Sequence, residues 1–229
     1  MLKPLNSNSL YSNCGNASIL QFIDESDRTI LDIGCGAGDT GKLIRSVYPE
    51  THVTGITCSE AEYREAIQKL DYCICIDVER DVLPTLTYKN FDVLSFIHVL
   101  EHLVDPIAVI QKLLPYLKIG GKVIIALPNI ANWRYRLQIA LGKFEYTDGG
   151  VMDKTHLHFY TFYTAPQYLI EPVPQLKIEK CLVSGGLPLG SVLNKLVGSK
   201  TRQTLDKQSC RWNPNLFGYE ILMLSKKII

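Results

Sequence analysis

Short runs of apolar residues alternate along the chain with longer stretches in which apolar residues recur at helical spacing. This alternation predicts a largely parallel sheet with helices on both faces, because parallel strands need crossover connections and bury both of their sides. We expect seven strands, at Thr29–Gly34, His52–Thr57, Tyr72–Asp77, Phe91–Ile97, Lys122–Leu127, Leu176–Val183 and Leu216–Ser225. The predicted fold class is therefore α/β, with a doubly wound sheet.

Helix signals occupy the gaps between these strands. An apolar stripe over Ile19–Ile23 precedes the first strand. The sequence SEAE at Ser59–Glu62 is typical of a capping box, and we expect its helix to continue to Leu70. A further helix is expected to begin at Pro106, a residue suited to the first helical turn, and to end at Gly120–Gly121.

Two segments do not fit the alternation of strands and helices. Pro128–Thr161 follows the fifth strand, and Leu187–Asn215 separates the last two strands and carries five Lys or Arg residues against one acidic residue, Asp206. Doubly wound sheets place such connections over the ligand crevice. We therefore expect a single domain, residues 1–229, in which segments 128–161 and 187–215 form a small lid.

The first lid segment contains the signal of an amphipathic helix, NIANWRYRLQIAL. Its apolar positions, among them Trp133 and Leu137, are expected to pack against the domain. Arg134 and Arg136 fall outside this stripe, so they either attract a phosphate or carboxylate of a ligand or lie on a solvated face. Gly149–Gly150 predicts a tight turn or a hinge later in the segment.

Composition narrows the functional classes. The chain of 229 residues is 46% hydrophobic, enough for a full core, and its net charge of +1 gives no electrostatic signature of nucleic-acid binding. No run of 18 apolar residues predicts a membrane span, and residues 1–13 lack the apolar core of a secretion signal. The seven cysteines form neither a disulfide framework nor a CxxC metal motif, so we expect free thiols and a cytoplasmic protein.

The sequence ILDIGCGAGDTG, at the first predicted strand and just beyond it, allows two interpretations. Gly36, Gly38 and Gly41 match G-x-G-x-x-G, the dinucleotide fingerprint, and Glu60 lies near the position of a ribose-binding acid. This interpretation predicts an NAD-dependent oxidoreductase. A lone fingerprint of this kind is weak evidence.

The same segment also reads D-x-G-x-G-x-G, from Asp32 through Gly34, Gly36 and Gly38. An acid at the end of the strand repels a pyrophosphate but attracts an ammonium group, while backbone N–H groups of the loop can hold a carboxylate. A ligand that joins an amino acid to a nucleoside carries both groups. The glycines then permit close approach of the backbone to such a ligand.

Four segments, in order, resemble the motifs of the class I S-adenosylmethionine-dependent methyltransferases: LDIGCGAG, VTGIT, FDVLSFIHVLEHLVDP and LLPYLKIGGKVIIALPN. The segment GKFEYTDGGVMDKTHLHFYT is similar to one in the methionine-biosynthesis-protein-W-like and ubiquinone-methyltransferase-like branch. The resemblance implies a Rossmann-like sheet of seven strands with an antiparallel seventh strand. It also implies the cofactor S-adenosylmethionine, the product S-adenosylhomocysteine, and O- or N-methylation of a small-molecule or sugar/glycan-type acceptor.

The resemblance assigns the methionine end of the cofactor to four residues, Asp32, Gly34, Gly36 and Gly38. Gly41 is expected to serve helix packing. The acid that ends the second strand in the family, and bonds both ribose hydroxyls, is replaced here by Thr57, a neutral group. Glu60 either substitutes for this acid or belongs to the first turn of the next helix.

The resemblance extends to the ends of the third and fourth strands. Asp77 matches the position that takes the adenine amino group, with Val78 stacking nearby, and a surface turn is the alternative for Asp77. His98 stands beside the methionine moiety, where the family commonly has a small or acidic residue. Glu101 and His102 either shape the pocket or cap the next helix.

The segment DKTHLHFYT contains the candidate catalytic groups. On a strand, His156 and His158 share one face, and together with Asp153 they could ligate a metal. The resemblance argues against a metal, because relatives have Arg at the position of His158. We predict instead that His156 is a general base or substrate ligand oriented by Asp153, or that the histidines hold the lid through backbone hydrogen bonds.

Two other functional classes stay open. Thr57, in place of the ribose-binding acid, favours a non-catalytic S-adenosylmethionine-binding or regulatory protein of the same fold. The NAD-dependent oxidoreductase is the weaker alternative, since it depends on the glycine fingerprint alone.

Overall fold

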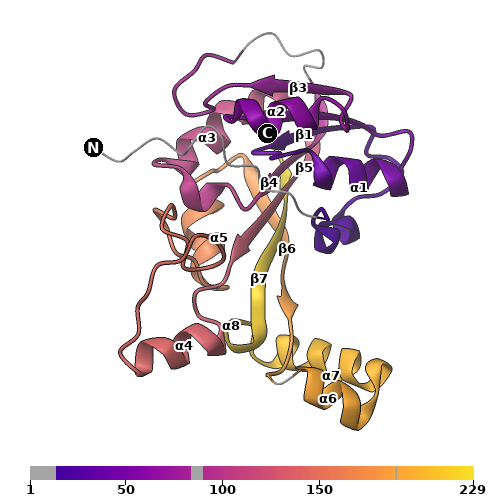
Figure 1. Cartoon of the computed structure of the whole chain (residues 1–229). Coiled ribbons are helices and arrows are strands. Elements are labelled where there is room, and N and C mark those ends of the chain that lie inside the picture. The colour runs from indigo at the N-terminus through magenta and orange to yellow at the C-terminus, as the bar shows by residue number, and fades with distance from the viewer. Residues whose placement is uncertain (1–13, 84–89, 189) are drawn as a thin grey trace.

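The computed structural model describes residues 14–83, 90–188 and 190–229. Residues 1–13, in which no secretion signal is expected, lie outside the described residues. The described part of the chain forms one mixed sheet with buried apolar clusters on both faces (Figure 1).

The sheet has the seven strands that the sequence predicts. They are β1 (Thr29–Ile33), β2 (His52–Thr57), β3 (Tyr72–Cys75), β4 (Phe91–Ile97), β5 (Leu117–Pro128), β6 (Leu176–Gly185) and β7 (Gly218–Lys227). Their order is β3-β2-β1-β4-β5-β7-β6, and β7 runs antiparallel to both of its neighbours. The remaining neighbours pair in parallel, so the expected Rossmann-like sheet with an antiparallel seventh strand is confirmed.

Alternate residues of the central strands bury opposite faces of the sheet, because successive side chains of a strand point to opposite sides. On β1, Ile30 belongs to one buried cluster, whereas Leu31 and Ile33 belong to the other. Ile124 and Ile125 of β5 divide in the same way. Burial on both faces explains why these strands are nearly continuous apolar runs in the sequence.

Helices supply the other half of each cluster. The 3-10 helix η1 (Ala17–Phe22), α1 (Asp39–Val47) and α2 (Glu60–Ala66) pack on one face, and α3 (Pro106–Leu113) and α5 (Thr164–Leu169) pack on the other. The remaining helices are η2 (Leu100–His102), η3 (Leu114–Tyr116), α4 (Trp133–Ala140), α6 (Gly190–Val197), α7 (Ser199–Trp212) and α8 (Pro214–Phe217). Ser59 caps α2 as predicted, although the helix ends at Ala66, short of Leu70.

The prediction that the helix from Pro106 extends to Gly120–Gly121 is wrong. α3 ends at Leu113, and β5 already begins at Leu117. Pro115 accounts for the early end, because proline has no N–H to donate and its ring collides with the carbonyl of the preceding turn. The glycine pair therefore lies inside β5 rather than at a helix end.

Helix α1 packs closely against its neighbours through Gly41. A Cβ added to Gly41 would lie 2.3 Å from Cδ2 of Leu70 and 2.9 Å from Cγ1 of Val53. The expectation that Gly41 serves helix packing is confirmed.

The two segments expected to form a lid lie toward the end of the molecule where β5 ends and β7 begins (Figure 1). Segment 187–215 is not the basic loop suggested by its charges, because α6, α7 and α8 occupy it. Lys, Arg, Gln and Leu are good helix formers, and α7 contains neither Gly nor Pro. Closure of these segments over a ligand stays a prediction.

The apolar stripe expected to pack α4 against the domain does so only at the start of the helix, where Trp133 is half-buried. Leu137 is 52% exposed and Leu141, just past the helix, is 65% exposed. α4 stands beyond the end of the sheet (Figure 1), so the amphipathic spacing does not lead to burial along the rest of the helix. The turn expected at Gly149–Gly150 is present, with φ of +80° at Gly150.

Two further expectations concern the whole chain. Among the described residues, no helix is long and apolar enough to span a membrane. All seven cysteines carry free thiols, and Sγ of Cys35 lies 3.9 Å from Sγ of Cys73.

The topology fixes where a ligand can bind. The strand order reverses between β1 and β4, which are neighbours in the sheet. Open α/β sheets bind ligands at such a reversal, beyond the carboxyl ends of the strands. The segments that follow β1, β2, β3 and β4 therefore form the candidate site.

Candidate functional site

The turn after β1 is a glycine loop with a backbone that other residues rarely adopt. Gly34, Gly36 and Gly38 have φ of +69°, +53° and +79°. A Cβ added to Gly34 would lie 2.6 Å from Cγ2 of Val99, in the connection after β4, whereas the nearest atom to a Cβ on Gly36 would be 3.8 Å away. Gly34 thus lets the segments after β1 and β4 touch, and Gly36 leaves space above the loop.

Asp32 lies near the end of β1 and is only 1% exposed. Its Oδ1 accepts a hydrogen bond from Oγ of Ser95 at 2.7 Å. Burial raises the pKa of Asp32 to about 6, and the bond from Ser95 opposes this rise. A desolvated carboxylate with one short hydrogen bond is suited to a cationic ligand. Ser95 lies in the middle of β4, and no motif points to it.

The end of β2 is occupied by the buried hydroxyl of Thr57. Its Oγ1 donates to Oε2 of Glu62 at 2.7 Å and accepts from the N–H of Ser59 at 3.3 Å. Glu62 belongs to the first turn of α2, so the helix returns a carboxylate to the strand end. Glu60, the acid considered from the sequence, lies exposed in the same turn. The sequence predicts for Glu62 only a role in the capping box of the helix.

Asp77 occupies the turn after β3. Its Oδ1 accepts from the N–H groups of Glu79 and Arg80 at 3.0 and 3.3 Å, and its side chain is 39% exposed. This is the surface-turn arrangement that the sequence left open. Val78 is buried in the core cluster of the α3 face. Contacts of Asp77 and Val78 with an adenine stay predictions.

His98 follows β4 with a φ of 55°, which is uncommon for a residue other than glycine. Its Nε2 lies 2.8 Å from Oε1 of Glu220 on β7, and its Nδ1 lies 3.5 Å from Oε1 of Glu101. Loss of solvation lowers the pKa of His98, but the carboxylates of Glu101 and Glu220 outweigh it and raise the pKa to about 10. His98 is therefore a cation held between two acids.

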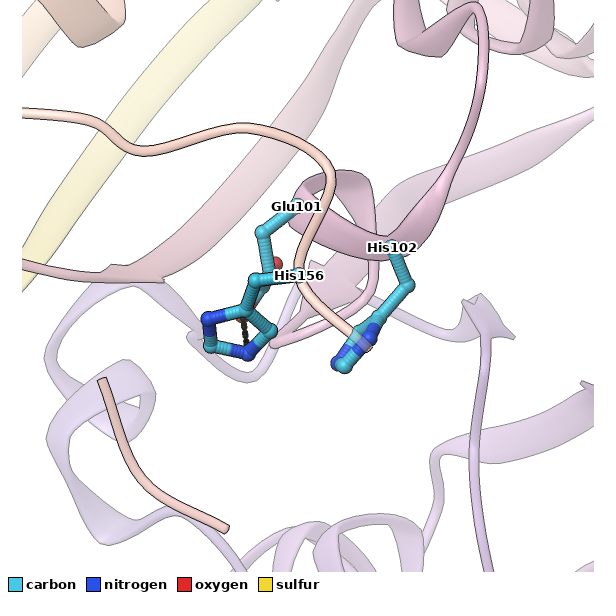
Figure 2. Close-up of side chains that lie close together, drawn as sticks. All are labelled: Glu101, His102 and His156. Atoms are coloured by element: carbon cyan, nitrogen blue, oxygen red, sulfur yellow. Dashed lines mark ion pairs between the residues drawn. The ribbon is translucent and has the colours of Figure 1, made fainter. Parts of the chain in front are cut away.

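Three side chains from two distant parts of the sequence lie close together (Figure 2). Glu101 and His102 belong to η2, and His156 comes from the first lid segment. Nε2 of His156 lies 4.0 Å from Oε1 of Glu101, and the centroids of the two imidazole rings are 4.6 Å apart. Glu101 is fully buried, and neither carboxylate oxygen has a hydrogen-bond partner among the described residues. A buried carboxylate requires a proton, a cation or a polar ligand nearby. The His98 cation, whose Nδ1 lies 3.5 Å from Oε1 of Glu101, supplies this charge.

Hydrogen bonds determine which nitrogen of each ring carries a proton. Nδ1 of His156 lies 3.0 Å from the carbonyl oxygen of Val151, which can only accept, so Nδ1 is the protonated nitrogen. The hydroxyl of Thr155 donates to Asp153 at 2.6 Å, so it accepts from Nδ1 of His102 at 3.0 Å. Burial lowers the pKa of His156, which is therefore neutral near pH 7. His156 thus keeps an unprotonated Nε2.

The predicted partnership of Asp153 with His156 is realised differently. Asp153 accepts from the N–H and the hydroxyl of Thr155, at 2.8 and 2.6 Å, and the ring of His156 is oriented by Val151. Asp153 thus reaches the cluster through Thr155 and His102. The catalytic roles predicted for His156 and Asp153 stay predictions.

The metal set considered from the sequence does not come together. DKTHLHFYT forms turns rather than a strand, so His156 and His158 do not share a face. Nε2 of His158 lies 3.4 Å from the carbonyl oxygen of Val104 instead. Within the described residues, the group with metal-ligand spacing is Glu101, His102 and His156, whose ligand atoms lie within 4.8 Å of one another.

A surface hollow of about 270 Å³ lies between α4 and the segment that follows it. Arg134, Tyr135, Lys143 and Glu145 contribute to its lining. Arg136 does not line it, and its Nε donates to the carbonyl of Ala131 at 2.6 Å. Of the two arginines singled out in the sequence, only Arg134 therefore faces this hollow.

Residues 13–175 match the model of a protein family described as methionine biosynthesis protein MetW. The ubiquinone biosynthesis O-methyltransferase of Idiomarina loihiensis is 28% identical over 170 residues, which cover 69% of this chain and 64% of that protein. The trans-aconitate 2-methyltransferase of Klebsiella pneumoniae is 30% identical over 105 residues, which cover 46% of this chain and 40% of that protein. The chain thus spans less than two thirds of the length of these curated relatives.

Solved structures share the fold. A SAM-dependent methyltransferase from Archaeoglobus fulgidus superposes with a TM-score of 0.60 at 19% identity, over 92% of each chain. The plantazolicin methyltransferase BpumL, solved in complex with SAH, gives a TM-score of 0.56 at 24% identity, over 87% of this chain and 76% of that one. These likenesses place the sheet and its helices in the Rossmann-like fold of the methyltransferases.

Proposed function

Because the chain belongs to the methionine biosynthesis protein MetW family, we propose that it is an S-adenosylmethionine-dependent methyltransferase. Its acceptor is a small molecule or a glycan-type compound that is methylated on oxygen or nitrogen. The observation that carries this proposal is the buried cluster of Glu101, His102 and His156. Glu101 and His102 follow β4 closely, just after Val99, which lies against the glycine loop, and His156 reaches them from the lid segment. A proton acceptor therefore lies close to the proposed cofactor site.

The residues after β1 and β4 fit the methionine end of this cofactor. Asp32 offers a buried carboxylate for the ammonium group, and His98 is a cation suited to the methionine carboxylate. The space above Gly36 admits the ligand close to the backbone. Asp77 and Val78 are assigned to the adenine. When bound, S-adenosylmethionine supplies a methyl group already activated by its sulfonium sulfur.

The histidine cluster can accept the proton that the acceptor loses, which the cofactor cannot do. A hydroxyl or amine must lose its proton as it is methylated, and a positioned imidazole is suited to take that proton. His156 presents an unprotonated Nε2, and the imidazolium formed there would lie 4.0 Å from the carboxylate of Glu101. Thr155, itself bonded to Asp153, accepts a hydrogen bond from Nδ1 of His102 and so orients this second ring.

The hollow between α4 and the segment that follows it supports a small polar acceptor. The hollow beside α4 presents the charged side chains of Arg134, Lys143 and Glu145 next to an aromatic ring, Tyr135. Charged groups and an aromatic face together suit sugars and polar metabolites.

Two measurements test the proposal. Calorimetric titration with S-adenosylmethionine, S-adenosylhomocysteine and NAD should show binding of both sulfur nucleosides and none of NAD. Transfer of a radiolabelled methyl group should then be measured into a panel of phenols, amines and sugars. Lack of binding of either sulfur nucleoside would refute the proposal, and binding without transfer to any class would favour the non-catalytic alternative.

The role of His156 has a matched control within the same segment. His156→Gln should lower turnover by roughly 100-fold or more, as expected for loss of a general base, and leave the Kd of S-adenosylhomocysteine unchanged. His158→Ala should leave both quantities near wild type, because His158 contacts Val104 rather than the cluster. Equal activity of the two variants would remove His156 from the chemistry.

A further inference from the structure

Ribose hydroxyls in a buried site need hydrogen-bond acceptors, yet β2 ends in Thr57 rather than in an acid. We propose that Glu62, from the first turn of α2, binds the ribose hydroxyls of the cofactor, so that a helix supplies the carboxylate that the strand lacks. The inference rests on the proposed cofactor. It assigns the ribose to Glu62 and not to Glu60, the acid of the same helical turn that the sequence analysis considered.

The hydroxyl of Thr57 already makes two hydrogen bonds within the protein. Its single hydroxyl proton goes to Oε2 of Glu62 at 2.7 Å, and its oxygen accepts from the N–H of Ser59 at 3.3 Å. A threonine hydroxyl has one proton and two acceptor positions, so one acceptor position at most is left for a ligand. Thr57 therefore acts as a positioning residue that holds Glu62 in place.

Glu62 has both the position and the capacity that Thr57 lacks. Its Oε1 would be the nearest atom, at 3.8 Å, to a Cβ placed on Gly36, so its carboxylate faces the glycine loop. A carboxylate accepts about four hydrogen bonds over its two oxygens, so the bond from Thr57 leaves enough positions for two ribose hydroxyls. The carboxylate thus lies between the ends of β1 and β2. The ribose of the proposed cofactor would lie there, between its methionine part and its adenine part.

The pKa of the Cys35 thiol, inside the glycine loop, is affected by the charges of both Asp32 and Glu62. Its pKa is raised first by the hydrogen bond with Cys73, then by burial, and then by the negative charges of Asp32 and Glu62. The two carboxylates therefore act on the same loop from different sides. Asp32 comes from β1 and Glu62 from α2.

Glu60 provides a control from the same helical turn. The pKa of Cys75, at the end of β3, is raised to about 11, first by burial and then by the charge and hydrogen bond of Glu60. Glu60 is thus directed to the edge strand β3 and is exposed. Its removal alters the charge of the first turn by the same amount as removal of Glu62, but leaves the glycine loop untouched.

The test uses calorimetric titration of the full chain with S-adenosylhomocysteine and with its 2′-deoxy and 3′-deoxy analogues. Wild type should bind the deoxy analogues more weakly, and Glu62→Ala should bind S-adenosylhomocysteine roughly 10- to 100-fold more weakly, as expected for loss of charge-assisted hydrogen bonds. In Glu62→Ala the preference for the ribose compound should vanish. Glu60→Ala should keep both the affinity and the preference.

A purely structural role of Glu62, such as capping α2, would lower the stability and the affinity for all three ligands by one common factor. That outcome, or an unchanged Kd of Glu62→Ala, would overturn the inference. Thr57→Val should weaken the ribose preference in part, and Thr57→Ser should restore it. If wild type bound no S-adenosylhomocysteine, the proposed function would fail instead, which separates the two failures.

Discussion

Replacing Asp32 by Asn should destroy cofactor binding and at the same time stabilise the free protein. Asp32 is almost fully buried, accepts one hydrogen bond from Ser95, and has its pKa raised from 3.8 to about 6. Because the folded protein holds this proton more tightly than the unfolded chain, stability contributed by the group falls as pH rises from about 4 through 6. Two pKa units correspond to about 3 kcal/mol of destabilisation above pH 6.

Urea unfolding at pH 4 and pH 7.5 measures this effect. Asp32→Asn should match the wild type at pH 4 and exceed its free energy of unfolding by up to about 3 kcal/mol at pH 7.5. Saturating S-adenosylhomocysteine should stabilise the wild type but not the variant, since only a protein that binds the ligand gains stability from it. A variant that is less stable than wild type at pH 7.5 without ligand would refute the idea that Asp32 is held at a cost in stability.

Other predictions concern the same crevice. Gly34→Ala should lower the free energy of unfolding by about 2 to 4 kcal/mol, because the alanine would have to adopt a left-handed backbone and its Cβ would collide with Val99. Val99→Ala should recover only part of the steric cost, because it removes Cγ2, 2.6 Å from the added Cβ, but keeps the Val99 Cβ at 2.9 Å. Gly36→Ala has only the backbone cost, so its free energy of unfolding should fall by about 1 kcal/mol. If Gly34→Ala is destabilised by no more than this, the collision with Val99 does not contribute to stability. NMR titration should show His98 still protonated at pH 8, and Glu220→Gln should lower its pKa. EDTA should leave methyl transfer unchanged, whereas Zn²⁺ should inhibit it by occupying the imidazole lone pairs.

The sheet could be predicted because its physical signal is local. Strands buried on both faces must be apolar at nearly every position, so β1, β4 and β5 stand out as runs bounded by glycine and polar residues. Helix ends were less certain, since apolar spacing continued past Leu113 although Pro115 stops the helix there. In α4 the spacing was real, yet nothing in the sequence showed that this helix lies beyond the sheet.

The site could be predicted only as far as neighbouring residues define it. Asp32 and the glycines lie in one turn, so their motif contained most of the geometry. Glu101 and His156 are separated by 54 positions, and the docking of the lid segment depends on the N–H groups of Leu157 and His158 bonding the carbonyl of Glu101. This contact depends on backbone turns in DKTHLHFYT, whereas the alternating histidines of that segment predict a strand.

The charges of the crevice connect the proposed chemistry with binding. Four carboxylates gather at the ends of β1, β2, β4 and β7: Asp32, Glu62, Glu101 and Glu220. The proposed methyl donor carries one net positive charge, which its product lacks, so an acidic crevice favours the donor over the product. In the proposed reaction, the proton that the acceptor loses to His156 would replace the lost charge beside Glu101. The net charge of the crevice and its ligands would therefore be the same before and after the methyl transfer, and it would change only when that proton leaves.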